Sequence, residues 1–353
     1  MTTDITLLTA EAVELLKRLI ATPRTSRDEA AAADILQRFM QETCQLPTQR
    51  DGNNLWSVAP GYDAARPTLL LNAHIDTVRP VSAWVRDPFT PTLEGDRLYG
   101  LGSNDDGASL VSLLQVFRCL RLRELPYNLI FLASAEEEVS GKGGIEHALP
   151  LLPPIDVALV GEPTGMQPAV AEKGLMVLDV TAHGRAGHAA RNEGDNAIYH
   201  AMDDMQWFRQ KQWERISPLL GPVKMTVTIV QAGTQHNVIP DQCTFTIDVR
   251  SNECYSNEEL LSLITAEVKS EVKARSTRLN SSHIDAQHWL VQRAVKLGRT
   301  PFGSPTLSDQ ALLSCPSLKM GPGDSRRSHT ADEFICISEI EEAIRLYLQL
   351  LAE

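Results

Sequence analysis

Three short, almost wholly apolar runs in the first half of the chain constrain its fold more than any other feature. They are residues 68–73, 129–133 and 157–160. Runs of this length without polar alternation are typical of strands that are buried on both faces of a sheet. A helical pattern at residues 108–120 lies between the first two runs. This alternation of strands and helices predicts an α/β layer with a mixed, largely parallel sheet.

Side chains that bind metals follow these predicted strands. His74 comes directly after the first strand, and Glu162 comes just after the third. Three consecutive glutamates, residues 136–138, follow the second strand, and Asp105 lies in a turn that contains Gly and Ser. Because ligands collect at the carboxyl ends of strands in open α/β sheets, we expect these groups to meet at one edge. Histidine with carboxylates and no nearby cysteine suits zinc, cobalt or manganese in a hydrolytic site better than a structural zinc.

Each of these signals is modest when it is taken alone. A buried histidine such as His74 is more often a satisfied core residue than a ligand, although Asp76 lies on the same face of the strand and could orient its imidazole. Asp105 alone fits a capping residue for the helix that follows. The crowded charges of residues 136–138 fit either a surface loop or a cation site, since like charges repel without a compensating cation. His329, in a late loop rich in Gly, Pro and Ser, would supply a further ligand.

The sequence also predicts the start of a helix near the N-terminus. Ser26-Arg27-Asp28-Glu29 matches a capping box, in which the serine and the glutamate satisfy the first backbone amides of a helix. The apolar residues Leu36 and Met40 then lie on one face of the predicted helix.

From about Ala171 the pattern changes to that of half-exposed antiparallel strands. Residues 175–181, 224–230 and 244–250 alternate apolar and polar side chains. Helical stretches at residues 196–209 and 258–274 separate or follow these strands, and a last strand is expected near Thr277. This order fits a split βαβ, ferredoxin-like α+β module.

The module interrupts the segment that carries the candidate ligands. Glu162 precedes it and His329 follows it, so the metal-binding domain is expected to be discontinuous. We assign residues 1–170 and 277–353 to this catalytic domain. We expect residues 171–276 to form the inserted domain, for which a lid and dimerisation role is implied only by the resemblance to a known family.

The acidic composition argues against two classes of partner. The 353 residues carry a formal net charge of −12 at pH 7, which disfavours nucleic acid and anionic membranes because phosphate groups need clustered Lys and Arg. The sequence contains neither a run long enough to span a membrane nor a signal-peptide pattern. The six scattered cysteines form no C-x-x-C pair and are expected to be reduced thiols. A cytoplasmic location is therefore expected.

The order of the candidate residues resembles the acetylornithine deacetylase / succinyl-diaminopimelate desuccinylase family of di-zinc amidohydrolases, which are kin to aminoacylases and glutamate-type carboxypeptidases. The likeness runs from Pro23-Arg24-Thr25-Ser26 to Glu333-Phe334-Ile335. It implies two divalent metal ions as cofactors, with zinc as the first choice and cobalt as the alternative. The ligand sets that the resemblance implies are His74, Asp105 and Glu162 for one ion, and Asp105, Glu138 and His329 for the other.

The resemblance also implies catalytic roles. Glu137 would be the general base that takes a proton from the attacking water and later delivers it to the leaving nitrogen. Asp76 would support His74. The third acid of the run, Glu136, leaves a shift of this assignment by one residue open. Relatives often have a lysine soon after the bridging aspartate, whereas Asp106 stands next to it here.

Three residues of the inserted module match family positions that contact substrate. His188 resembles a histidine that reaches across a dimer interface to stabilise the oxyanion, which implies a homodimer. Asn237 begins a segment that resembles a substrate-contacting one. Arg250 resembles the anchor for the substrate's α-carboxylate, because the planar guanidinium pairs both carboxylate oxygens. The alternatives are an ordinary loop residue for His188 and a strand-end ion pair for Arg250.

The predicted function is hydrolysis of an amide in a small N-acyl amino acid. The enzyme would remove an acetyl or succinyl group from the α-nitrogen of an ornithine- or citrulline-like substrate, and the resemblance implies a role in arginine biosynthesis. Succinyl-diaminopimelate desuccinylase and a metallo-dipeptidase or carboxypeptidase are rivals with the same site. A catalytically inactive binding protein is disfavoured, because every implied ligand and the base have the required residue type.

Overall fold

The computed structural model describes residues 4–191 and 193–352 and divides the chain into two compact units. Unit 1 comprises Met1–Val170, Ile284–Phe302 and Ser308–Glu353, and unit 2 comprises Ala171–His283 and Gly303–Leu307. The sequence analysis placed the corresponding boundaries at residues 171 and 277.

The largest sheet has nine strands and a parallel centre. Its strands are β1 (Gln49–Asp51), β2 (Asn54–Val58), β3 (Thr68–His74), β6 (Asn128–Ser134), β7 (Val157–Val160), β8 (Ala169–Glu172), β15 (Ser282–His283), β16 (Phe302–Ser304) and β17 (Ser317–Lys319). They run in the order β1-β2-β6-β3-β7-β17-β8-β15, and β16 pairs with β8. The neighbours β6, β3, β7 and β17 are parallel, whereas β1-β2, β2-β6, β17-β8 and β8-β15 are antiparallel. The predicted mixed α/β sheet is confirmed.

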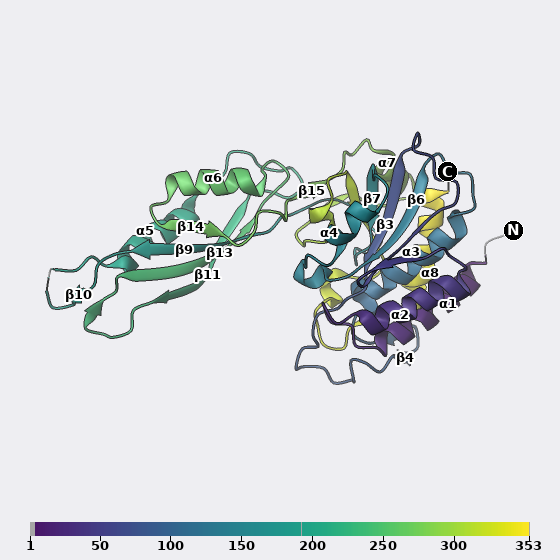
Figure 1. Ribbon diagram of the computed structural model, residues 1–353, viewed down its shortest axis with the longest axis horizontal. Coiled ribbons are helices and arrows are strands. Elements are labelled where there is room, and N and C mark those ends of the chain that lie inside the picture. Colours follow the sequence, from purple (N-terminus) through teal and green to yellow (C-terminus); the bar gives the residue numbers. More distant parts are fainter. Residues whose placement is uncertain (1–3, 192, 353) are drawn as a thin grey trace. The chain divides into compact units, whose positions relative to one another are not determined.

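Both faces of the central strands are covered. In β3, Leu69 and Leu71 belong to one apolar cluster, and Leu70 belongs to another on the opposite face. Helices pack on the first face and contact one another (Figure 1). They are α1 (Ile5–Ile20), α3 (Ala108–Leu120) and α8 (Ile337–Leu351), while the short α4 (Ile145–Ala148) contributes to the second cluster. Burial on both sides explains why the three predicted strands lack polar alternation. These strands and the predicted helix at residues 108–120 are confirmed.

The predicted N-terminal helix forms, but its capping box is wrong. α2 (Ala30–Arg38) has no side-chain cap and continues into a π-helical turn. The hydroxyl of Ser26 instead donates to Asp76 Oδ2 at 2.7 Å. Glu29 Oε1 accepts the backbone amide of Glu136 at 3.1 Å. Both polar groups contact loops that are distant in sequence, so local spacing could not reveal their partners.

Unit 2 contains a four-stranded antiparallel sheet and two helices. In chain order these are β9 (Met176–His183), α5 (Ala197–Gln210), β11 (Lys224–Ala232), β13 (Gln242–Arg250), α6 (Asn257–Glu267) and β14 (Glu271–Ala274). The strand order is β11-β13-β9-β14, with every pair antiparallel. This chain order and strand order are those of the predicted ferredoxin-like module, which is confirmed.

The end of the predicted helix at residues 258–274 is wrong. α6 ends at Glu267, because the carboxylate of Asp204 accepts the backbone amides of Lys269 at 3.2 Å and Ser270 at 2.9 Å. The chain then extends into β14, which is the last strand that was expected near Thr277.

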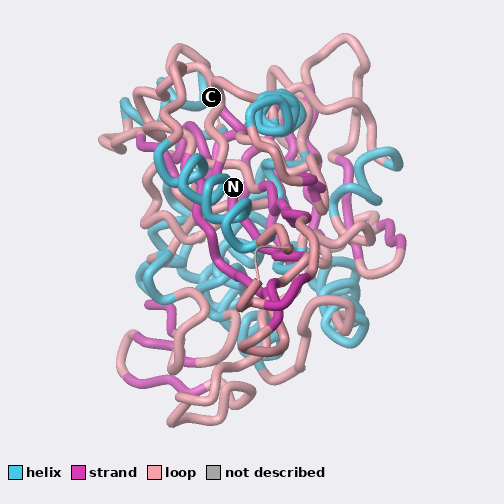
Figure 2. The backbone as a smooth tube through the Cα atoms, turned by 90° about the vertical axis from the view of Figure 1, so that its left-hand side faces the viewer, coloured by secondary structure: helices cyan, strands magenta, loops and turns pink. Residues whose placement is uncertain are grey.

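Short elements and loops complete the structure. A three-stranded sheet has the order β18-β5-β4, and a two-stranded one pairs β10 with β12. The bounds are β4 (Thr92–Glu94), β5 (Arg97–Tyr99), β10 (Gly187–His188), β12 (Val238–Ile239), α7 (Trp289–Lys296) and β18 (Phe334–Cys336). Loops, drawn in pink in Figure 2, join many of these short strands. All six cysteines have free thiols, and none of the helices in the described ranges is long and apolar enough to cross a membrane.

Candidate metal centre

Acidic side chains and a histidine of unit 1 meet where the parallel strands end. His74 is the last residue of β3, and Glu162 lies two residues beyond β7. Glu137 and Glu138 begin a 3₁₀ turn that follows β6. Asp105 lies in the turn that precedes α3. The edge of the sheet therefore brings together residues that are up to 88 positions apart in sequence, from His74 to Glu162.

His74 lies among three of the carboxyl groups. Its Nε2 atom is 3.2 Å from Asp105 Oδ1. The same nitrogen is 3.9 Å from Glu137 Oε2 and 3.9 Å from Glu162 Oε1. The side chain of His74 is only 2% exposed, so these groups surround it in the interior of unit 1.

The late histidine approaches the same cluster from the loop before β18. His329 Nε2 is 2.9 Å from Glu138 Oε2 and 3.6 Å from Asp105 Oδ2. Asp105 thus faces His74 with one oxygen and His329 with the other, as a carboxylate that bridges two cations would.

Two sets of side chains have the spacing of a metal site. In each set, one ligand atom from every residue lies within 4.8 Å of the others. The first set is His74, Asp105 and Glu138, and the second is His74, Glu137 and Glu162. The ligand sets implied by the resemblance instead group Glu162 with Asp105, and Glu138 with His329. Short distances nevertheless join all the candidate side chains in one cluster, which consists of His74, Asp105, Glu137, Glu138, Glu162 and His329.

The electrostatics of the cluster favour a cation. Burial raises the pKa of Glu137 and of Glu162 well above the usual value, and neighbouring carboxyl groups add to the shift. The hydrogen bond with Glu138 raises the pKa of His329 to about 9. Burial acts to lower the pKa of His74, but hydrogen bonds to carboxylates raise it well above its usual value. Packed carboxylates with two imidazoles form a donor set that fits divalent metal ions, because such ions compensate the crowded negative charge.

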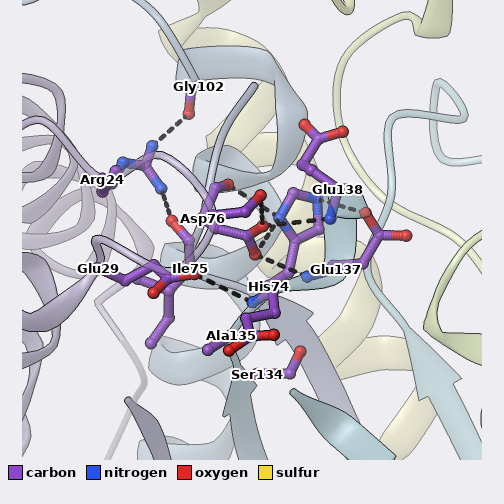
Figure 3. A network of polar contacts seen from close by, with 12 residues as sticks. Arg24, Glu29, His74, Ile75, Asp76, Gly102, Ser134, Ala135, Glu137 and Glu138 are labelled. Carbon is purple, nitrogen blue, oxygen red and sulfur yellow. Dashed lines mark hydrogen bonds and ion pairs between the residues drawn. The ribbon is translucent and has the colours of Figure 1, made fainter. Parts of the chain in front are cut away.

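Asp76 supports the turn that carries two of the glutamates (Figure 3). Its carboxylate accepts the backbone amides of Glu137 at 3.0 Å and Glu138 at 3.1 Å. His74 Nδ1 lies 3.0 Å from the backbone carbonyl of Asp76 and 3.5 Å from its Oδ1. These contacts orient the imidazole so that its Nε2 faces the cluster.

Glu136 has a different environment from the two glutamates that follow it. Its φ of 55° turns the chain, and its Oε2 accepts the backbone amide of Gly143 at 3.4 Å. A Cβ atom on Gly141 would lie 1.9 Å from the same Oε2 and 2.6 Å from Glu136 Cβ, so a side chain there would displace the carboxylate. The side chain of Glu136 therefore belongs to the turn at residues 141–143.

Sequence reasoning missed two buried groups beside the cluster. The guanidinium of Arg24 donates to the backbone carbonyls of Ile75 and Gly102. Glu333 accepts the backbone amides of Gly102, Asn104 and Asp105 at 2.8–3.1 Å, and burial raises its pKa to about 7. Both residues lie within the stretches that carry the family resemblance, but no local pattern marks them as buried.

Asp309 is a third buried group that the sequence analysis did not identify. It is 4% exposed and accepts a hydrogen bond from Ser134 Oγ at 2.5 Å, at the end of β6. Its charge also contributes to the raised pKa of Glu137. Ser308 caps the 3₁₀ turn that begins at Asp309, so the local sequence indicates a cap and does not mark a buried carboxyl group.

The candidate residues of unit 2 lie in two places. His188 pairs with Val238 in the β10-β12 ladder, and the amide of Ala189 donates to the carbonyl of Asn237 at 3.0 Å. Arg250 is at the far end of β13, roughly 26 Å from the start of that strand at a rise of about 3.3 Å per residue. Its guanidinium donates to Asp248 at 2.8 and 3.1 Å.

The profile of peptidase family M20/M25/M40 matches residues 70–353, a segment that contains every candidate metal ligand. The chain belongs to this family. Enzymes of this family are metal-dependent hydrolases, and the cluster around His74 is a candidate metal-binding site of this family member. The resemblance inferred from the sequence is thereby confirmed.

Relatives of this family member cover nearly its whole length. Acetylornithine deacetylases from Proteus mirabilis (strain HI4320) and Shigella sonnei (strain Ss046) are each 28% identical and align with 96% of this chain, and with 95% and 96% of their own. Among solved structures, a tripeptidase from Staphylococcus aureus has a TM-score of 0.76 at 18% identity, with 97% of each chain covered. A dinuclear metal-binding M20 peptidase from Bacillus subtilis has a TM-score of 0.72 at 17% identity, with 98% of each covered. The solved structures support the fold.

Proposed function

We propose that this protein is a di-metal deacylase of N-acyl amino acids. It hydrolyses the amide that joins an acetyl or succinyl group to the α-nitrogen of an ornithine- or citrulline-like substrate, as a cytoplasmic step of arginine biosynthesis. The observation that carries the proposal is the cluster in which Asp105 faces both His74 and His329. The relatives from Proteus mirabilis and Shigella sonnei are acetylornithine deacetylases, and this similarity supports the choice of substrate.

The two ions are zinc in this proposal, with cobalt as the alternative. When bound, such ions polarise the substrate carbonyl and lower the pKa of water. The ligands are His74, Asp105 and Glu162 for one ion and Asp105, Glu138 and His329 for the other. Carboxylates and imidazoles without thiolates suit a hydrolytic site of this kind.

Glu137 is the general base in this mechanism. Its carboxyl group is 10% exposed and lies 3.9 Å from His74, whereas the carboxylate of Glu136 is held by the turn at residues 141–143. Glu137 takes a proton from the attacking water and delivers it to the leaving nitrogen. Asp76 keeps Glu137 in place through the backbone amide of that residue.

A homodimer completes the site. His188 lies in the β10-β12 pair, which follows the end of β9 where β13 begins, whereas Arg250 lies at the other end of β13. One copy of the module therefore cannot present both to a small substrate. A second copy would supply His188 to the oxyanion, while Arg250 binds the substrate's α-carboxylate in place of its contact with Asp248.

Unit 2 also carries a surface suited to a second copy. β11 is the outer strand of its sheet, and Ile229 and Val230 in it are 50% and 51% exposed. On the adjoining α5, Tyr199 and Met202 are 67% and 55% exposed. A cavity of about 580 Å³ lies between this helix and β11. Outer strands and exposed apolar side chains are typical of surfaces that pair with another chain.

Amine release from a panel of substrates tests the proposal. The panel is N-acetylornithine, N-succinylornithine, N-acetylcitrulline and N-succinyl-diaminopimelate, each with zinc or cobalt and again after chelation. Chelator-sensitive turnover of an ornithine or citrulline derivative well above the others supports the deacylase. A preference for N-succinyl-diaminopimelate favours the desuccinylase instead. If the metal-loaded protein turns over none of the four substrates but hydrolyses dipeptides in a second panel, it is a metallo-dipeptidase or carboxypeptidase.

A further inference from the structure

Arg24 is an arginine enclosed within unit 1, immediately behind the metal cluster. Its side chain is 1% exposed, and it is the largest of the fully buried side chains in the described part of the chain. Figure 3 shows its guanidinium between two backbone carbonyls. Nη1 donates to the carbonyl of Ile75, and Nη2 donates to that of Gly102 at 2.8 Å.

These two carbonyls belong to the segments that carry the ligands. Ile75 stands between His74 and Asp76, and Gly102 stands three residues before Asp105. Within the described residues, no backbone amide of one of these segments donates to a backbone carbonyl of the other. The guanidinium therefore joins the end of β3 to the turn that carries Asp105, where the two ligand atoms are 3.2 Å apart.

The turn is shaped to receive this guanidinium. Gly102 has a φ of +71°, and a Cβ atom on it would lie 2.4 Å from Arg24 Nη2. Glu333 holds the other side of the turn by accepting the backbone amides of Gly102 and Asp105 at 3.1 and 2.9 Å. The peptide groups are thus held between the guanidinium of Arg24 and the carboxyl group of Glu333, both of which are buried.

The segment that carries Arg24 is itself anchored to the same region. The amide of Thr77 donates to the carbonyl of Arg24 at 3.0 Å, and the amide of Ser26 donates to the carbonyl of Thr77 at 3.3 Å. Arg24 therefore cannot shift without moving the residues after β3.

We propose that Arg24 is a positioning residue for the metal centre, which sets the separation of His74 and Asp105 by joining the carbonyls of Ile75 and Gly102. The proposal rests on the metal site of the proposed function and is independent of its substrate. A lysine at this position keeps the charge but cannot hold both carbonyls in the planar geometry of a guanidinium.

The test compares Arg24→Lys with a control, Arg66→Lys, at an arginine whose side chain is 39% exposed. Arg66 also joins two backbone carbonyls of unit 1, those of Leu125 at 3.2 Å and Gly61 at 2.7 Å, but contacts none of the metal candidates in the described structure. Zinc is titrated calorimetrically into each chelator-treated full-length protein. Thermal unfolding of each variant with and without zinc is followed by circular dichroism, and Arg24→Met is included as a variant that also removes the charge.

We expect Arg24→Lys to remain folded and to bind zinc 10- to 100-fold more weakly, as is usual when a group that supports a ligand is changed. The rise in melting temperature that zinc produces should shrink accordingly, because a ligand stabilises only through its affinity for the folded state. Arg66→Lys should bind zinc as the wild type does. Arg24→Met should show at least the same loss of zinc-dependent stabilisation.

Two outcomes overturn the inference. If Arg24→Lys binds zinc within twofold of the wild type, the bridge does not set the ligand separation. If Arg66→Lys loses as much affinity as Arg24→Lys, the effect is a general loss of stability. Wild-type protein that binds no zinc or cobalt would instead overturn the metal site of the proposed function. Wild-type protein that binds zinc but deacylates none of the substrates leaves the inference about Arg24 standing.

Discussion

Replacement of Asp76 by asparagine measures how much the supporting hydrogen bonds contribute. Asp76 is fully buried, and its carboxylate accepts the amides of Glu137 and Glu138 and the hydroxyl of Ser26 at 2.7–3.1 Å. Asparagine keeps one acceptor oxygen and turns an NH₂ group toward one of these donors. An unpaired buried donor costs about 1–3 kcal/mol, and loss of the charge on the remaining bonds adds about 1 kcal/mol. We expect the free energy of unfolding to fall by about 3 kcal/mol.

The same substitution should weaken metal binding. The carboxylate of Asp76 accepts the backbone amides of Glu137 and Glu138. When this carboxylate is replaced, the turn that presents these two side chains to the cluster is held less firmly. We expect zinc affinity to fall 10- to 100-fold. Urea unfolding of the chelated protein and calorimetric titration of zinc measure the two effects separately.

Asp204→Asn in unit 2 is a matched control. Asp204 is 5% exposed and also accepts two backbone amides and a serine hydroxyl, from Lys269 and Ser270. It should lower the stability of unit 2 by a similar amount and leave zinc affinity unchanged. Full zinc affinity in Asp76→Asn, or an equal loss of affinity in the control, would refute the role given to Asp76.

Three further predictions address the site. Glu137→Ala should abolish turnover while metal content, measured by elemental analysis, stays at the wild-type level; an active variant would move the base to Glu136. His188→Ala and Arg250→Met should each be inactive, whereas an equal mixture after reassociation should recover about a quarter of wild-type activity, because half of the dimers then have one intact site; a mixture without activity contradicts a site shared between subunits. In the metal-free protein, Glu333 has its pKa raised by burial from 4.5 to about 7. The folded state therefore holds a proton that the unfolded chain releases, and stability should fall between about pH 4.5 and 7, by on the order of 3 kcal/mol from this group. Thermal unfolding of chelated protein at several pH values checks this, and stability that rises over that range contradicts it.

The sequence alone determined the central strands and the order of elements in the inserted module. The runs at residues 68–73 and 157–160 are apolar on both faces because helices or loops cover both sides of the sheet, and this burial is visible in each run by itself. Residue type and position at strand ends also pointed to His74, Glu162 and the glutamates after β6, because parallel strands end at one edge.

The tertiary structure decided which polar group meets which. Ser26 and Glu29 have the spacing of a capping box, yet their partners are Asp76 and Glu136. The environments of Glu136 and Glu137 differ because a residue with positive φ turns the chain between β6 and the 3₁₀ turn. A partner that is 50 or more residues away leaves no periodic trace in the local sequence.

Arg24 is the clearest example of a residue whose environment the local sequence does not predict. An arginine after a proline near the N-terminus is expected to be exposed, since charged side chains are almost never fully buried unless they are paired. Its burial becomes favourable only when the carbonyls of Ile75 and Gly102 and the neighbouring carboxylates of the folded chain are assembled around it. Apolar periodicity, a local property, thus determined the elements, whereas the pairing of buried polar groups depended on the folded chain.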